Sequence, residues 1–390
     1  MIPQGSSAPE LNTSLCPKPI RGVGVLTVEC FRPCSGRPPV MQRAPVPYWL
    51  RVSHDLSATP IAAHPPLGTL PLVTLYLTER CNSRCITCDY WRHGRSDMDL
   101  AAVRRLLPSF AQLRTRSVLL SGGEPLLNPE WAAIAELLRR NRLHVWLLTS
   151  GLALAKHARR APELFDAITV SLDGTDPKTY AAIRGLDAFH KVCEGIRAAA
   201  DTGLRPSIRV TLQRGNFRRL PAFIDLAKDL GARQVSFLAV DVANPHAFGR
   251  SDDFASDLAL QPEDLPVFEQ ILSSVERDHQ EDFRSGFIAE SPQKLRRIHQ
   301  YFAALQGQRR YPPVRCNAPE FSAVIGATGR VQPCFFISGP PDSQVSAIGR
   351  DANLWDALND DDMSALRAQI RAGMRPECKT CVCSMWRDPA

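Results

Sequence analysis

The sequence of 390 residues lacks any long hydrophobic run, because no apolar stretch reaches the roughly 18–20 residues that a membrane helix needs. It also lacks a secretory signal pattern, since the opening "MIPQGSSAPELNTSL" has no charged start followed by an apolar segment. No basic stripe interleaved with aromatic residues occurs, and the net charge of +7 is spread along the chain. These absences predict a cytoplasmic protein that binds neither a membrane nor nucleic acid.

Proline is concentrated at the start of the chain, where the first 66 residues hold 12 of the 32 prolines. Such a stretch sustains neither helices nor central strands. We therefore expect residues 1–70 to form an extended, partly disordered arm, with a short strand pair near "YWLRVSH". Met41 is a second candidate for the natural start.

From residue 70 onward, apolar runs bounded by turns alternate with segments of helical period. The runs predict six buried strands, at residues 72–78, 117–123, 144–151, 167–174, 207–213 and 234–240. This alternation implies parallel strands joined by right-handed crossovers, with functional loops at the carboxyl ends of the strands. The pattern fits both a partial barrel and an open, doubly wound sheet.

The order is looser after residue 240. A long loop is expected over residues 241–262, followed by helices near 262–278 and 291–306. Two strand-like runs around the turn "GATGR" predict a β-hairpin. A helix at "DDMSALRAQIRAG" then leads to the terminal "CKTCVC".

The twelve cysteines fall into groups, and in a reducing compartment such groups are more often metal ligands than disulfides. Cys193 lies in a helical pattern and is expected to be a small buried hydrophobe. The sequence assigns no role to Cys16, Cys30 and Cys34. The first group is Cys81, Cys85 and Cys88; the second is Cys316, Cys334, Cys378, Cys381 and Cys383.

The first group has the spacing C-x3-C-x2-C and directly follows the first predicted strand. Three thiolates can each bind one iron of a cubane cluster and leave the fourth iron open, whereas ferredoxin-type sites use four. The alternative is structural zinc, which needs four closed ligands, and no C-x2-C partner lies nearby in this part of the chain. The spacing favours the three-thiolate cluster and leaves zinc as the alternative.

These residues resemble the radical S-adenosylmethionine (radical SAM) superfamily, whose signature is this cysteine loop with an aromatic residue beside the third cysteine. The aromatics here are Tyr90 and Trp91, one residue further on than the common pattern. The second strand ends in "SGGEPLLNPE", which matches the GGEP element of the family. The resemblance covers roughly residues 70–240 and implies a partial (β/α)6 TIM-like barrel.

The resemblance implies that Cys81, Cys85 and Cys88 hold a [4Fe–4S] cluster whose open iron is chelated by SAM. An electron from a flavodoxin- or ferredoxin-type partner would cleave SAM reductively and give a 5′-deoxyadenosyl radical. Glycines allow close backbone approach to a ligand, and a carboxylate can accept from the methionine ammonium. For the residues that end strands three ("TSG") and four ("SLDG"), turn formation at a strand end is an equally good interpretation of each residue taken singly. The implied SAM contacts are Gly122, Gly123, Glu124, Pro125, Ser171, Asp173, Arg209 and Asn216.

The second group reads C-x12-G-x4-C, followed far downstream by "CKTC". It resembles the SPASM/twitch appendage of radical SAM enzymes, which implies one auxiliary [4Fe–4S] cluster. Its ligands would be Cys316, Cys334, Cys378 and Cys381, with Cys383 as a substitute or a bystander. A zinc ribbon of the same thiols is the alternative. The expected domains are residues 1–70 (arm), 71–262 (barrel), 263–310 (helical connection) and 311–390 (auxiliary-cluster domain).

The implied function is oxidative tailoring of a small metabolite or cofactor precursor. The N-terminal segment does not resemble the winged-helix peptide-binding domain that peptide-modifying members often carry, and no cobalamin-binding domain is apparent. The alternatives are a maturase of a ribosomally made peptide and, from another class, a non-catalytic iron–sulfur or zinc scaffold. Substrate contacts are expected from Asp241 and His246 in the loop after strand six.

Overall fold

The computed structural model describes residues 66–244, 247–249, 256–337, 339 and 353–388. Several sequence-based expectations lie outside these ranges and are not addressed by the structure. They are the strand pair near residues 48–54, Met41, the three N-terminal cysteines and His246. Within the described ranges, no helix is both long enough and apolar enough to cross a membrane.

Parallel strands form the centre of the fold, and all six predicted strands are confirmed. Neighbours in the sheet are neighbours in sequence, as βα repeats with right-handed crossovers require. Each strand ends one to three residues before the apolar run does, because the last residues of the run turn into the loop that follows. The strands are β1 (Leu72–Tyr76), β2 (Ser117–Ser121), β3 (His144–Thr149), β4 (Ala167–Ser171), β5 (Ser207–Leu212) and β6 (Gln234–Ala239).

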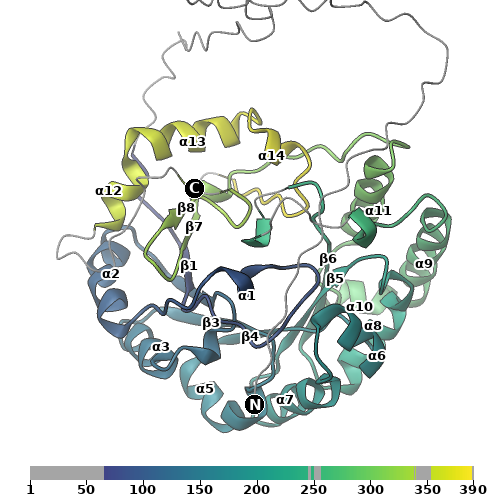
Figure 1. Cartoon of the computed structure of the whole chain (residues 1–390), viewed down its shortest axis with the longest axis horizontal. Helices are drawn as coiled ribbons and strands as arrows, with labels where there is room; N and C mark the ends of the chain where they lie inside the picture. Colours follow the sequence, from purple (N-terminus) through teal and green to yellow (C-terminus); the bar gives the residue numbers. More distant parts are fainter. Residues whose placement is uncertain (1–65, 245–246, 250–255, 338, 340–352, 389–390) are drawn as a thin grey trace, which may run out of the picture. The chain divides into compact units, whose positions relative to one another are not determined.

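Helices surround the curved sheet on its outer side, so the fold is a partial barrel rather than a flat doubly wound sheet (Figure 1). The short helix α1 (Tyr90–His93), which follows the cysteine loop, lies on the inner side of the curve (Figure 1). The outer helices are α2 (Leu100–Gln112), α3 (Trp131–Arg140), α4 (Leu154–His157), α5 (Ala161–Leu164), α6 (Pro177–Arg184), α7 (Phe189–Asp201) and α8 (Leu220–Asp229).

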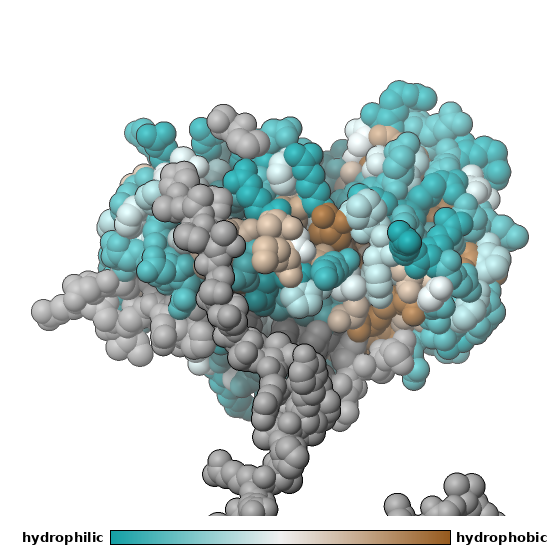
Figure 2. All heavy atoms as spheres, turned by 90° about the horizontal axis from the view of Figure 1, so that it is seen from above, coloured by the Kyte–Doolittle hydropathy of each residue, from teal (hydrophilic) through white to brown (hydrophobic). Residues whose placement is uncertain are grey.

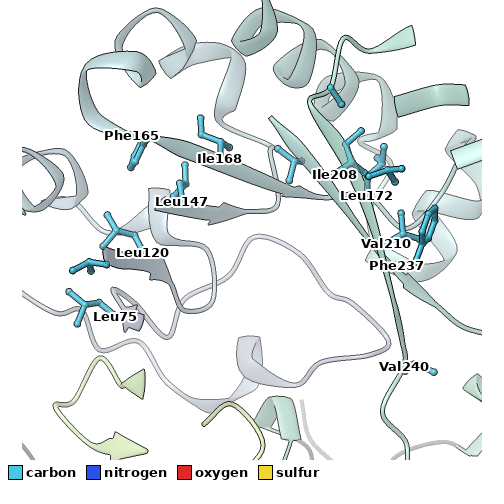
Figure 3. Close-up of a cluster of buried hydrophobic side chains, with 14 of the residues drawn as sticks. Leu75, Leu120, Leu147, Phe165, Ile168, Leu172, Ile208, Val210, Phe237 and Val240 are labelled. Atoms are coloured by element: carbon cyan, nitrogen blue, oxygen red, sulfur yellow. The ribbon is translucent and has the colours of Figure 1, made fainter. Parts of the chain in front are cut away.

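The core lies between the strands and these helices. Leu75, Leu120, Leu147 and Ile168 stand opposite one another in register across β1 to β4, and all are almost completely buried (Figure 3). Burial of each such side chain contributes about 1.5–3 kcal/mol. Because side chains alternate along a strand, the residues directly before and after these four positions in each strand point to the inside of the barrel.

The chain after β6 continues into helices that confirm the two predicted near residues 262–278 and 291–306. They are α9 (Leu265–Asp278), α10 (Gln280–Arg284) and α11 (Pro292–Leu305). The predicted hairpin is also present, as β7 (Ser322–Ile325) and β8 (Val331–Gln332), which pair in antiparallel fashion. The last helices are α12 (Leu354–Asn359), α13 (Asp361–Arg371) and α14 (Pro376–Lys379).

The hairpin is not confined to the C-terminal region, because β7 pairs in parallel with β1 and extends the barrel sheet. Helix α12 adds a second link, since the side chain of Asn359 bonds with both backbone groups of Leu67. Ser109 on α2 likewise accepts a hydrogen bond from the backbone N–H of Leu354. The C-terminal cysteine region is therefore attached to the β1 edge of the barrel, and the division of the chain into domains stays a prediction.

Candidate functional site

A cavity of about 240 Å³ opens at the carboxyl ends of the strands. Its walls come from the inward-pointing strand residues, such as Tyr76 of β1, Ser121 of β2 and Thr211 of β5, and from the three cysteines of the first group. On the face shown in Figure 2, hydrophilic residues dominate the surface, and hydrophobic residues gather in a hollow near its middle. The structure thus brings the cysteine loop and the strand ends to one site, where parallel α/β proteins bind their ligands.

The cysteine loop is held in place by the end of helix α6. The backbone N–H groups of Arg84 and Ile86 donate to the carbonyls of Arg184 and Ile183, both at 3.0 Å. Gly185, which ends the helix in the left-handed region (φ 73°), allows this approach, because a Cβ there would lie 2.3 Å from the Arg84 carbonyl oxygen. The loop conformation therefore depends on a segment about one hundred residues downstream.

The glycine turn after β2 packs directly on the backbone that leads to Cys81. The N–H of Gly123 donates to the carbonyl of Thr78 at 2.8 Å, and a Cβ on Gly123 would lie 2.2 Å from the Arg80 carbonyl oxygen. Gly122 has φ 127°, a conformation that side chains rarely adopt. Both glycines line the cavity, as expected of residues that allow close approach of a ligand.

Glu124 and Pro125 lie behind the cavity wall rather than on it. The buried carboxylate of Glu124 accepts hydrogen bonds from the Thr149 hydroxyl and the Ser150 N–H, each at 2.7 Å. Pro125 begins the short 3-10 helix η2 (Pro125–Leu127). In this conformation Glu124 positions the "TSG" turn after β3, while its contact with a SAM ammonium stays a prediction.

Asp173 and Asn216 also lie behind the wall. Asp173 accepts from the N–H of Thr211 at 2.7 Å and from Nη1 of Arg184 at 3.1 Å. The Asn216 amide donates to the carbonyls of Asp173 and Thr211, both at 3.0 Å. Of the predicted SAM contacts, the residues that line the cavity are Gly122, Gly123, Ser171 and Arg209.

Arg184 is a residue of the site that sequence reasoning missed. Its guanidinium is almost fully buried, lines the cavity and pairs with Asp173. Burial lowers the pKa of Arg184, but the neighbouring Cys85 and Asp173 outweigh burial and raise it, so this side chain is a fixed cation. The only sequence signal is an arginine before a helix-ending glycine, which is too common to identify a site.

Three buried polar atoms around the cavity have no hydrogen-bond partner within the described part of the chain. They are the hydroxyl of Ser83, Nε1 of Trp91 and Nε of Arg184. Buried polar groups in folded proteins are nearly always paired, so unpaired ones at a cavity indicate a polar ligand. The glycine turn and the three thiols supply space and soft donors at the same place, and this donor set fits an iron–sulfur cluster with a polar molecule beside it.

Burial raises the pKa of Cys88 to about 12 and also raises the pKa values of Cys81 and Cys85. The thiols are therefore protonated at neutral pH in the metal-free protein, and a metal centre must displace three protons to bind. Within the described ranges, no three His, Cys, Asp or Glu side chains converge closely enough to hold a single metal ion.

The five cysteines of the second group line a second, smaller cavity of about 30 Å³. Cys316 precedes the 3-10 helix η7 (Ala318–Glu320), Cys334 follows β8, and Cys378 belongs to α14. Burial raises the pKa of Cys334 to about 12 and that of Cys378 to about 11. The remaining members, Cys381 and Cys383, lie in the tail after α14.

The tail is held by Asn317, the residue between Cys316 and the 3-10 helix η7. Its amide nitrogen donates to the carbonyl of Arg387 at 2.7 Å, and its amide oxygen accepts from the N–H of Arg387 at 2.9 Å. Its backbone N–H donates to the carbonyl of Met385, also at 2.9 Å. These hydrogen bonds explain how cysteines more than sixty residues apart in the sequence come to share one cavity.

The two cavities share part of their walls, because Phe335, Phe336 and Cys383 line both. Tyr76 lies between the two cysteine groups, since both Cys88 and Cys334 contribute to raising its pKa, although burial has the larger effect. Its ring contacts Tyr90 at 5.3 Å and Phe335 at 6.4 Å between centroids. The two thiol sites are therefore neighbours across an aromatic wall.

The fold and the site define a class: a partial parallel α/β barrel with a three-thiol loop and a glycine turn at its mouth. Residues 75–227 match the model of the Radical SAM superfamily. The relatives include the GTP 3′,8-cyclase of Yersinia pestis (34% identical over 163 residues, 40% of this chain and 50% of the cyclase). They also include the PqqA peptide cyclase of Streptomyces rochei (31% over 194 residues, 48% and 51%). The chain spans about half the length of the curated relatives it matches.

Solved structures confirm the fold. Streptococcus suis SuiB bound to precursor peptide SuiA superposes with a TM-score of 0.58 at 14% identity, covering 79% of this chain and 68% of SuiB. anSMEcpe with bound AdoMet and the Cp18Cys peptide gives 0.56 at 19% identity, covering 76% of this chain and 82% of anSMEcpe. At such identities the likeness concerns the fold alone.

Proposed function

We propose that this protein is a radical SAM enzyme in which Cys81, Cys85 and Cys88 hold a [4Fe–4S] cluster that binds SAM at the barrel mouth. The observation that carries the proposal is the meeting of these three thiols, the glycine turn and three unpartnered buried polar atoms around one cavity. When bound, the cluster and SAM supply a 5′-deoxyadenosyl radical that removes a hydrogen atom from the substrate.

The chain's own residues would bind and orient these groups. The buried guanidinium of Arg184 suits the carboxylate of SAM, because a charge-assisted hydrogen bond is strongest where water is excluded. Further contacts would come from the hydroxyl of Ser171, at the end of β4, and from the backbone of Gly122 and Gly123, directly after β2. Asp173 holds Arg184 from behind and is a positioning residue.

We further propose that Cys316, Cys334, Cys378 and Cys381 hold one auxiliary [4Fe–4S] cluster. The support is the gathering of these cysteines around one small cavity that adjoins the larger one. Backbone N–H groups reach the sulfurs, from Ala318 to Cys316 at 3.5 Å and from Phe336 to Cys334 at 3.4 Å. Such a cluster would supply an electron acceptor next to the substrate, so the reaction would be an oxidation of a small metabolite or a cofactor precursor.

A peptide maturase is the second candidate, and the comparisons favour it. One relative is named a peptide cyclase, and the solved structures include complexes with a precursor peptide and with a Cys-containing peptide. Deuterium transfer into 5′-deoxyadenosine separates the two candidates. Transfer from a labelled peptide and not from small metabolites would replace the first candidate with the second.

The electron would come from a flavodoxin- or ferredoxin-type carrier. Ile86, between Cys85 and Cys88, is 45% exposed, so the outer side of the cysteine loop is accessible to a protein partner. Arg84 within the loop is exposed as well, and the side chain of Arg92 on α1 is 63% exposed although it pairs with Asp89. An acidic carrier protein suits such a surface.

The test is anaerobic reconstitution with iron and sulfide, reduction with dithionite, addition of SAM and detection of 5′-deoxyadenosine. We expect the product from the natural protein and none from Cys81→Ala. Cys193→Ala is the matched control, because Cys193 is buried in helix α7, away from both cavities, and its loss should change neither iron content nor product. Iron-loaded protein that yields no 5′-deoxyadenosine would instead support the non-catalytic scaffold.

A further inference from the structure

The second cavity holds one thiol more than a cluster needs. Five cysteines line it, whereas a [4Fe–4S] cubane with complete thiolate ligation takes four. The tail brings two of them, Cys381 and Cys383, with one residue between them. In the proposed auxiliary site, one of the five must therefore remain free.

The position of Cys383 distinguishes it from the other four. It also lines the larger cavity, whereas Cys316, Cys334, Cys378 and Cys381 line the smaller one alone. Its neighbours on the larger side are barrel residues: Arg209 of β5 and Asp241 after β6 lie within electrostatic reach of its sulfur. Both of these residues line the larger cavity as well.

The local backbone supports the same distinction. The N–H of Cys383 donates to the sulfur of Cys381 at 3.4 Å, the pattern also found at Cys316 and Cys334, whose sulfurs accept from the backbone two residues on. Backbone donors to sulfur are typical of cluster ligands, because they stabilise the negative charge of the cluster. Cys381 thus has the surroundings of a ligand, and Cys383 supplies the donor.

We propose that Cys383 is not a ligand of the auxiliary cluster but a free thiol in the wall between the two cavities, in contact with the molecule bound at the barrel mouth. This inference rests on the proposed auxiliary cluster. The thiol, Arg209 and Asp241 then form one patch on the cavity wall nearest to the second site. The part of the substrate that loses an electron faces this patch, so Cys383 is a determinant of substrate position.

The first test is a matched pair of serine variants, two residues apart in the same tail. The natural protein, reconstituted anaerobically, should hold about eight irons per chain, four for each cubane. We expect Cys383→Ser to keep about eight and Cys381→Ser to fall toward about four, because serine is a poor substitute for a thiolate ligand. Loss of four irons from Cys383→Ser, with Cys381→Ser unaffected, would overturn the proposal.

The second test maps free thiols in the cluster-loaded natural protein by alkylation and mass spectrometry. Iodoacetamide should modify Cys383 and leave Cys316, Cys334, Cys378 and Cys381 protected by iron. A polyethylene-glycol maleimide, too bulky for a cavity of about 240 Å³, should leave Cys383 unmodified. Because Cys383 is partly buried, the reactions are compared at completion rather than by rate.

The outcomes separate this inference from the function on which it rests. About eight irons with Cys383 protected from iodoacetamide would overturn the free thiol and leave the auxiliary cluster intact. Reaction of Cys383 with the bulky maleimide would show that it faces solvent and would overturn its place in the cavity wall. About four irons, with all five thiols of the second group modified, would overturn the auxiliary cluster itself.

Discussion

The buried ion pair between Arg184 and Asp173 allows a quantitative test of the site. The two side chains are 11% and 2% exposed, and Nη1 of Arg184 lies 3.1 Å from the Asp173 carboxylate. Replacement of Arg184 by Met keeps a long side chain but removes the cation. The Asp173 carboxylate then keeps its hydrogen bond from the N–H of Thr211, at 2.7 Å.

The magnitude follows from the charge that is left behind. Removing one partner of a buried ion pair lowers the free energy of unfolding by about 3–5 kcal/mol. Because Asp173 keeps its hydrogen bond from Thr211, we expect Arg184→Met to lie at the lower end, about 3 kcal/mol. Adding Asp173→Asn removes the stranded charge while its amide oxygen still accepts from Thr211. The double variant should therefore lose only about 1–2 kcal/mol, the contribution of one ordinary buried hydrogen bond.

The assay is thermal unfolding of the metal-free protein followed by circular dichroism. With about 300 residues in the described part of the chain and about 2.1 cal/mol/K per residue, the unfolding entropy is about 0.6 kcal/mol/K. Arg184→Met should then lower the midpoint by about 5 °C and the double variant by about 2 °C. The control is Arg218→Met, which should shift the midpoint little, because Asp264 keeps its second partner, Arg214. The single variant Asp173→Asn completes the cycle, and a double variant whose shift equals the sum of the two single shifts would refute the coupling.

Three further predictions follow from the same site. Gly123→Ala should lower the iron content of the first cluster by more than half, because the new Cβ would lie 2.2 Å from the Arg80 carbonyl oxygen. The control is Gly68→Ala, where the new Cβ has no atom within 4 Å. Equal iron contents in the two variants would contradict the packing argument. Glu124→Ala should lower the free energy of unfolding by about 2 kcal/mol, since charge-assisted hydrogen bonds to the turn after β3 are lost; an unchanged urea midpoint would count against this. The free energy of unfolding of the metal-free protein should be constant below about pH 9 and fall by about 1 kcal/mol by pH 10. The reason is that the pKa of Cys88 is about 12 in the folded protein and 9.0 ordinarily, so the thiol ionises first in the unfolded chain. Cluster-loaded protein, whose thiols are already ionised, should lack this loss in the same pH series.

The strands and the cysteine groups were predictable because their signals are local. An apolar run such as residues 117–121 is buried wherever the strand lies in a parallel sheet, and a C-x3-C-x2-C loop is recognisable from spacing alone. The glycines were predictable from the local GGEP motif as residues that allow close approach of a ligand, and the structure adds that a Cβ on Gly123 would lie 2.2 Å from the Arg80 carbonyl oxygen. Local chemistry determines these features before the tertiary structure does.

Which residues of a motif face the cavity, and which lie behind its wall, was not predictable in this way. Ser171 and Asp173 lie in one short motif, yet Ser171 faces the cavity while Asp173 turns behind it to hold Arg184. The sequence shows that a polar residue ends a strand, but the direction of its side chain depends on the partner that the tertiary fold supplies. Arg184 and the pairing of β7 with β1 are set by contacts between distant segments, which leave no local pattern.

The distance in space between the two cysteine groups is set by the pairing of β1 with β7 in the sheet. The first group follows the carboxyl end of β1, and β7, hydrogen-bonded beside β1, leads through β8 to Cys334 of the second group. Tyr76, the last residue of β1, contacts an aromatic ring on each side, one from the cysteine loop and one beside Cys334. Core strands open only at free energies close to that of global unfolding, so the separation of the two sites does not depend on the tail that carries Cys381 and Cys383. Changes in that tail should therefore alter which thiols bind iron without altering where the two sites stand relative to each other.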